Sequence, residues 1–161
     1  MGPRLERGLG YVATGSADAA SAFLRASPLG RYLWITQHSA APPPEAGEVL
    51  RVATVSGDGP TVDPKRLGDL RAAAAAFLAR EAGGLLVLDC LEYLVLHNGP
   101  ERVARTLADV HDCVTMNGGS LVIFVDANTA NPRLVAWLAR EFDPLPSVRS
   151  VPSTPDDGLL A

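Results

Sequence analysis

Two runs of apolar residues that each end in an aspartate place the strongest constraint on the fold. Residues 85–88 read Leu-Leu-Val-Leu and are followed by Asp89, and residues 121–125 form a second such run before Asp126. A continuous apolar run of this length is typical of a strand buried on both faces of a parallel sheet. Each run therefore delivers one carboxylate to the edge of the sheet where the strands have their carboxyl ends.

Predicted strands and helices alternate along the whole chain. Because alternation favours right-handed crossovers between parallel strands, the sequence predicts an α/β fold, a three-layer sandwich with a mainly parallel sheet. The strands are expected at residues 8–14, 31–37, 50–55, 85–89 and 120–126. The helices are expected at residues 17–26, 64–82, 100–116 and 132–141, and a short helix or turn at 91–96.

Capping residues and apolar stripes define the predicted helices. Asp63 is the expected N-cap of the helix at 64–82, and Asn131 of the last helix, in each case with a proline at the first helical position. Pro100 begins the helix at 100–116, so three helices are expected to begin with proline. The buried stripe of the helix at 64–82 follows the 3.6-residue period and comprises Leu67, Leu70, Ala74, Phe77 and Leu78.

Length and composition fit one globular domain with a tail. The chain has 161 residues, of which 47% are hydrophobic and 20% charged. The domain is expected over residues 1–145, and a flexible proline-containing tail over 146–161. We expect a cytoplasmic protein, because the first residues lack the apolar segment of a secretory signal and the apolar runs are too short to cross a bilayer.

The charge and the cysteines exclude several classes of partner. The formal net charge is −4 and the arginines are scattered among acidic residues, so neither nucleic acid nor a membrane surface is an expected partner. Cys90 and Cys113 are the two cysteines and lack the spacing of metal ligands, so no metal site is expected.

The central segment resembles a known family. The residues that carry the resemblance are Leu88-Asp89-Cys90-Leu91-Glu92-Tyr93-Leu94, His97-Asn98-Gly99, Leu107, Asp112, Gly119-Ser120-Leu121-Val122-Ile123 and Asp126, with Gly10-Tyr11-Val12 and Leu33-Trp34-Ile35-Thr36 in the first half. Over residues 8–143 the chain is similar to the domain of unknown function 835 family. Gln37 and Cys90 depart from its usual pattern, which has arginine and glycine there.

Members of that family look like degenerate relatives of RecA-like ATPase cores and often accompany sensory and signalling modules. The resemblance therefore implies a RecA-like fold and a signalling context, and it leaves the biochemical role open. In such a core Asp89 would stand where an acidic residue holds Mg²⁺, and a phosphate loop would follow the first strand.

The residues after the first strand do not form a phosphate loop. Residues 15–21 contain one glycine and no lysine, and Asp18 lies in the first turn of the next helix, where it would repel phosphate. ATP hydrolysis and a bound cofactor are therefore not expected. Nucleotide binding without hydrolysis stays open, because a helix N-terminus can hold an anion.

Polar residues at the carboxyl edge of the sheet are the candidate binding surface. They are Ser16, Gln37, His38, Asp89, Glu92, Asn98, Asp126 and Asn128. Asp89 and Glu92, joined by Asp126, could form an acid–base or metal-binding group. The alternative is structural: Asp89 would accept hydrogen bonds from loop N–H groups, Glu92 would lie on an exposed turn, and Asp126 would end its strand. A serine nucleophile is not expected, because the chain has no Gly-x-Ser-x-Gly elbow.

An intact scaffold without phosphate-binding residues favours a non-catalytic domain that acts in signalling or regulation. It would bind another protein at the carboxyl edge or at an exposed edge strand, and the latter could also form a homodimer. The alternative is a ligand- or metal-binding sensor, with a nucleotide among the ligands, or a small enzyme that uses the same acidic residues.

Overall fold

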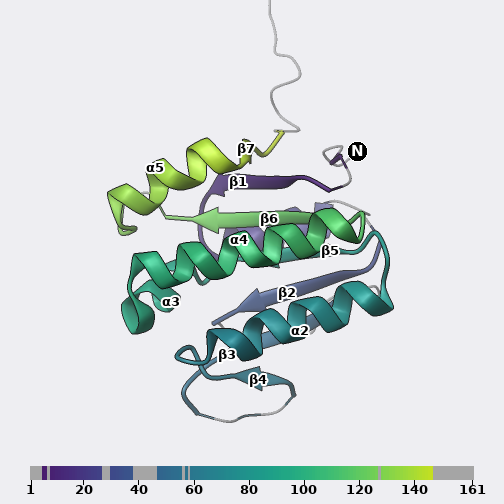
Figure 1. The fold of residues 1–161 in the computed structure, drawn as a ribbon, viewed down its shortest axis with the longest axis horizontal. Helices are drawn as coiled ribbons and strands as arrows, with labels where there is room; N and C mark the ends of the chain where they lie inside the picture. Colours follow the sequence, from purple (N-terminus) through teal and green to yellow (C-terminus); the bar gives the residue numbers. More distant parts are fainter. Residues whose placement is uncertain are drawn as a thin grey trace, which may run out of the picture.

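The fold is an α/β sandwich built on one sheet in which all neighbouring strands are parallel (Figure 1). The computed structural model describes residues 5–6, 8–26, 30–37, 47–55, 57, 59–126 and 128–146. Within them the strand order is β4-β3-β2-β5-β6-β1-β7. The strands are β1 (Gly10–Thr14), β2 (Tyr32–Thr36), β3 (Gly47–Val52), β4 (Thr61–Val62), β5 (Leu85–Leu88), β6 (Ser120–Val125) and β7 (Asp143–Pro144). The helices are α1 (Ala17–Ala26), α2 (Leu67–Arg80), α3 (Leu91–Asn98), α4 (Pro100–Met116) and α5 (Pro132–Glu141).

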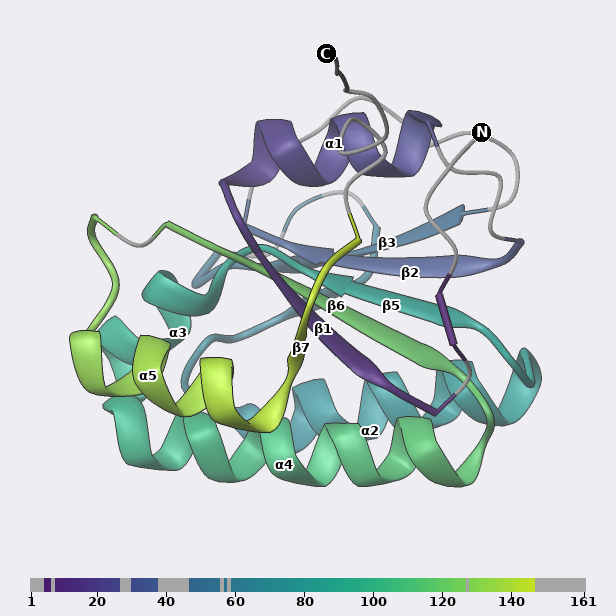
Figure 2. The same ribbon diagram turned by 90° about the horizontal axis from the view of Figure 1, so that it is seen from above.

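The helices cover the sheet unequally. Figure 2 shows α1 on one face and α2, α4 and α5 on the other, with α3 beside the point where β5 ends. The predicted three-layer α/β sandwich with a mainly parallel sheet is therefore confirmed, whereas the RecA-like core stays a prediction. None of the described helices is both long and apolar enough to cross a membrane.

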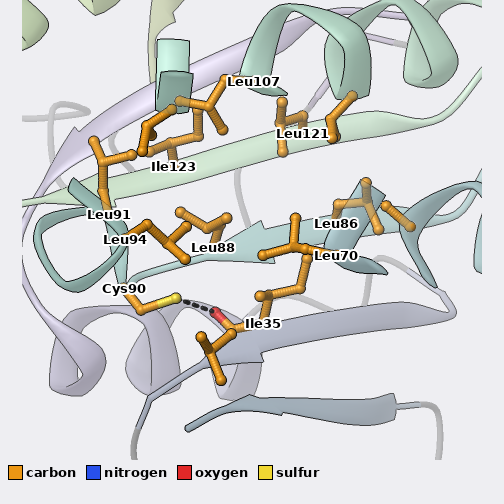
Figure 3. Close-up of a cluster of buried hydrophobic side chains, with 14 of the residues drawn as sticks. Ile35, Leu70, Leu86, Leu88, Cys90, Leu91, Leu94, Leu107, Leu121 and Ile123 are labelled. Atoms are coloured by element: carbon orange, nitrogen blue, oxygen red, sulfur yellow. Dashed lines mark hydrogen bonds between the residues drawn. The ribbon is translucent and has the colours of Figure 1, made fainter. Parts of the chain in front are cut away.

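The continuous apolar pattern of β5 serves two cores at once. Leu86 and Leu88 point toward α2 and α4, where they pack with residues of α3 and β6 such as Leu91 and Ile123 (Figure 3). Leu85 and Val87 point to the opposite face and pack in the cluster under α1. Because successive side chains of a strand alternate between faces, a strand covered on both sides has no polar position along its length. The predicted buried stripe of α2 is confirmed in all five residues.

The predicted start of α2 is wrong. The helix begins at Leu67, and Asp63 lies in a turn in which its carboxylate accepts a hydrogen bond from the Lys65 N–H at 2.8 Å. The Arg66 N–H closes that turn on the Asp63 carbonyl at 2.9 Å. Aspartate followed by proline is as typical of a β-turn as of a helix start, which explains the error. Only α4 and α5 of the described helices begin with proline.

Two strands differ from the prediction. β3 begins at Gly47 and ends at Val52, and its neighbour β4, at Thr61–Val62, was not expected. The Arg51 N–H donates to the Pro60 carbonyl at 3.1 Å, which joins the two strands. A two-residue strand leaves no periodic signal in a sequence. The short β7, at Asp143–Pro144, falls within the predicted domain. Residues 147–161 of the predicted tail lie outside the described residues.

The first strand and the last helix fit together at Gly10. A Cβ atom at this position would overlap the ring of Phe142, which follows α5 and is buried. The Phe142 ring lies 4.9 Å from the His111 ring and 5.8 Å from the Trp137 ring, measured between centroids. Glycine in β1 therefore gives an aromatic cluster direct contact with the backbone of the strand.

We predict that Asn131→Ala lowers the free energy of unfolding by about 1 kcal/mol, because its side-chain oxygen caps α5. This oxygen accepts hydrogen bonds from the N–H groups of Arg133 (2.9 Å) and Leu134 (3.3 Å). Asp63→Ala is the matched control and should lose less, since Asp63 supports a turn and caps no helix. Urea unfolding followed by circular dichroism measures both. A larger loss for Asp63→Ala would contradict the assigned helix starts.

Candidate functional site

Asp89 is a buried carboxylate held by an indole. It directly follows β5 and is only 8% exposed. Its Oδ2 atom accepts a hydrogen bond of 2.7 Å from Nε1 of Trp34, on the neighbouring strand β2. The register that pairs Ile35 with Leu88 places Thr36 next to Asp89. Since a buried charge is tolerated only when it is hydrogen-bonded, the Trp34–Asp89 bond allows this carboxylate to lie inside the fold. The sequence did not indicate this side-chain donor, and hydrogen bonds from loop N–H groups to Asp89 stay a prediction.

Glu92 and Asp126 connect α3 to the end of β6. Glu92 lies in the first turn of α3 and is half-buried, and its Oε2 atom accepts a hydrogen bond of 2.9 Å from the Asp126 N–H. The expectation that Glu92 lies on an exposed turn is therefore wrong. Asp126 does end its strand, and its Oδ1 atom accepts a hydrogen bond of 3.0 Å from the Asn128 N–H. Each of the two carboxylates thus accepts a hydrogen bond from a backbone N–H group.

The remaining candidates differ in their exposure. Ser16, Gln37 and Asn128 are exposed at the carboxyl edge. The side-chain amide of Asn98 instead donates to the Pro64 carbonyl at 2.7 Å and to the Leu94 carbonyl at 2.8 Å. Asn98 therefore joins the end of α3 to the turn before α2. His38 lies outside the described residues.

Glycine shapes the turn between β1 and α1. Gly15 has φ 146°, and a Cβ atom there would come within 2.5 Å of the Ala19 Cβ atom. Its N–H donates to the Val125 carbonyl at 2.9 Å, which ties the end of β1 to the end of β6. The carbonyl of Ser16 then accepts the first hydrogen bond of α1, from the Ala20 N–H at 3.1 Å. This packing brings Ser16 to the same edge as Asp126.

The carboxylates do not form a metal-binding cluster in the described part of the chain, where no three His, Cys, Asp or Glu side chains lie close enough together to hold an ion. Cys90 is buried and is not part of the carboxyl-edge surface either. Its thiol points into the core and lies 3.8 Å from the Ile35 carbonyl (Figure 3). Burial, and then the negative charge of Asp89, raise the pKa of the Cys90 thiol well above its ordinary value. The thiol therefore stays protonated at neutral pH and is a poor nucleophile.

The sequence did not indicate two residues at this edge, Trp34 and Arg51. Arg51 pairs with Thr36 in the β2–β3 register, while Leu50 and Val52 on either side of it pack in the α2 core. Arg51 therefore lies on the α1 face. A guanidinium, a hydroxyl and a carboxylate, from Arg51, Thr36 and Asp89, thus follow one another across three neighbouring strands. Period-two alternation could have placed Trp34 and Thr36 on one face, but the sequence does not reveal that β2 lies beside β5.

We predict that Trp34→Phe lowers the free energy of unfolding by about 1.5–3 kcal/mol, the usual worth of a hydrogen bond to a charged group. Phenylalanine retains most of the buried ring and removes the donor. Trp137→Phe is the matched control, because Trp137 is half-buried and packs edge-on against Phe142. Chemical unfolding of both variants provides the comparison. Equal losses in the two variants would mean that the Trp34–Asp89 bond contributes nothing specific.

Comparison with known protein families gives one match. A family model described as "Protein of unknown function (DUF835)" matches residues 28–142. The match covers more than two thirds of the chain and contains every element from β2 to α5, including the Trp34–Asp89 bond and Glu92. No curated protein matches the chain. The chain therefore belongs to the DUF835 family, whose function is unknown.

Proposed function

We propose that the chain is a non-catalytic regulatory domain that acts in a signalling assembly by binding another protein through its carboxyl edge. The observation that carries this proposal is the state of Asp89. Its carboxylate is buried and bound to Trp34, whereas an acid that holds Mg²⁺ for a nucleotide must reach the ligand. The turn after β1 supports the same conclusion, because it has no lysine and places Asp18 in the first turn of α1.

The exposed part of the edge suits a protein partner. Ser16, Gln37 and Asn128 are exposed, neutral and able to donate and accept hydrogen bonds. Polar side chains of this kind form the rim of protein–protein interfaces. The free thiols of Cys90 and Cys113 accord with the proposed cytoplasmic location.

The outer edge of β3 supports a second mode of assembly, with another copy of the chain or with a partner strand. In the described part of the chain β4 pairs only with Arg51 and Val52, and no strand pairs with the outer edge of residues 47–50. A mostly apolar pocket of about 460 Å³ lies beside this edge, lined by residues such as Leu33 and Ala73 together with the ion pair of Glu48 and Arg80. An unpaired strand edge next to a mostly apolar pocket favours addition of a strand.

A ligand-binding sensor, or a small enzyme, is the second candidate. Glu92 and Asp126 favour it, because both acids are only half-buried and lie together at the edge where open α/β folds bind ligands.

We predict that no nucleotide or divalent ion raises the melting temperature of the chain. A ligand at a hundred times its dissociation constant would add about 2.7 kcal/mol of stability, which thermal-shift measurement detects readily. A shift with Mg-ATP that disappears in Asp89→Asn would overturn the proposal in favour of the sensor or enzyme.

We also predict that Asn128→Arg removes at least one protein from the set captured by the tagged wild-type chain. The introduced side chain would add charge and bulk at the carboxyl edge without disturbing a buried group. Ala79→Arg is the matched control, because Ala79 is exposed on α2 in the helical layer. Quantitative mass spectrometry of the captured proteins gives the readout. If both variants lose the same proteins, or if neither loses any, the partner does not bind at the carboxyl edge.

A further inference from the structure

Three arginines gather in a groove between α2 and α4. The groove has a volume of about 180 Å³ and is lined by Arg71 of α2 and by Arg102 and Arg105 of α4, among others. The only acid in its lining is Asp109. In a chain of net charge −4 this is a local excess of positive charge. No part of the proposed carboxyl-edge surface belongs to it.

The arrangement of the two helices explains the convergence. Arg102, Arg105 and Asp109 are spaced i, i+3 and i+7 on α4 and so lie on one face of it. Because α2 and α4 each lead into a strand of the same parallel sheet, the two helices run in the same direction and their N-terminal turns lie together. The positive ends of both helix dipoles therefore add to the charge of the guanidinium groups.

Part of this charge is available to a partner. Nη1 of Arg71 lies 3.1 Å from Oδ2 of Asp109, and both side chains are about half exposed. Exposed pairs of this kind contribute little stability and exchange easily. Arg102 and Arg105 form no ion pair with any residue that the structure describes. The groove thus already binds one carboxylate and has two further guanidinium groups beside it.

We propose that this groove binds an acidic segment of a protein partner, with aspartate or glutamate side chains paired to Arg102 and Arg105. The inference rests on the proposed function in taking the ligand to be a protein. Guanidinium groups match carboxylates in planar, two-bonded pairs, and the Arg71–Asp109 contact already joins the two groups in the groove. A nucleic acid fits less well, because the three arginines lie in one small groove and do not form the extended basic surface that a continuous phosphate backbone needs.

Gly68 keeps the floor of the groove open. It lies in the first turn of α2, and a Cβ atom there would meet nothing within 4 Å. A larger side chain can therefore be introduced at this lining position without a clash at its Cβ atom and without changing any charge. Substitution at Gly68 thus tests how the shape of the groove affects binding while its charge stays the same.

The test is titration of the isotope-labelled full chain with a hexaglutamate peptide, followed by backbone amide chemical shifts at physiological ionic strength. We expect the shifts to lie in the first turns of α2 and α4. Arg102→Ala with Arg105→Ala should weaken binding about tenfold or more, since two charge-assisted contacts are lost. Gly68→Leu should weaken it comparably. Arg133→Ala with Arg140→Ala removes the same charge from exposed positions of α5 and should leave binding within about twofold.

Three results would overturn the inference. The first is equal weakening by the α5 double variant, which would show attraction by net charge alone. The second is a set of shifts outside the groove, or no binding by a wild-type chain whose amide spectrum shows it folded. The third is tighter binding of inorganic phosphate, or of an oligonucleotide of equal charge, than of the peptide.

The spectra also show whether each variant is folded, so a loss of binding by a misfolded variant is not counted. If Gly68→Leu is misfolded, Gly68→Met replaces it. Failure of this inference can be distinguished from failure of the proposed function, because the proposed function is tested by the loss of captured proteins in Asn128→Arg. Peptide binding at the groove with no capture at Asn128 would retain this inference and reject the carboxyl-edge partner.

Discussion

Burial of the central strand on both faces governs where this protein can carry polar chemistry. β5 has no polar side chain between Leu85 and Leu88, because α2 and α4 cover one face of it and α1 the other. The first polar residue is Asp89, at the end of the strand, and even this carboxylate stays inside the fold through its bond to Trp34. The central strand therefore offers no polar side chain before its carboxyl end.

The two proposed binding surfaces differ in character. The carboxyl edge exposes neutral polar residues such as Gln37 and Asn128, whereas the groove between α2 and α4 exposes arginines. A neutral surface selects a partner mainly by shape and hydrogen bonding, and a charged surface mainly speeds and orients its approach. The family match includes the segments that form β5, α2 and α4, whereas Ser16 of the carboxyl edge lies before it.

Much of the fold could be predicted from the sequence, because buried positions impose strict periods. The stripe from Leu67 to Leu78, the cap at Asn131 and the runs that became β5 and β6 all follow from such patterns. The features that escaped prediction depend on neighbours distant in the sequence or on very short segments. Trp34 meets Asp89 across 55 residues, and β4 has only two residues. The start of α2 was misplaced because Asp63 and Pro64 suit a turn equally well.

The contact at Gly10 joins a strand outside the family match to a residue inside it. Phe142 is the last residue of the family match, and the strand that covers its ring lies before residue 28, where the match begins. A fragment limited to residues 28–142 would expose that ring together with one side of β6, because β1 pairs with β6 along its whole length. Such a fragment would present an unpaired strand and an uncovered aromatic surface, which are features that promote aggregation. The matched range therefore omits a strand that pairs with β6 and covers Phe142.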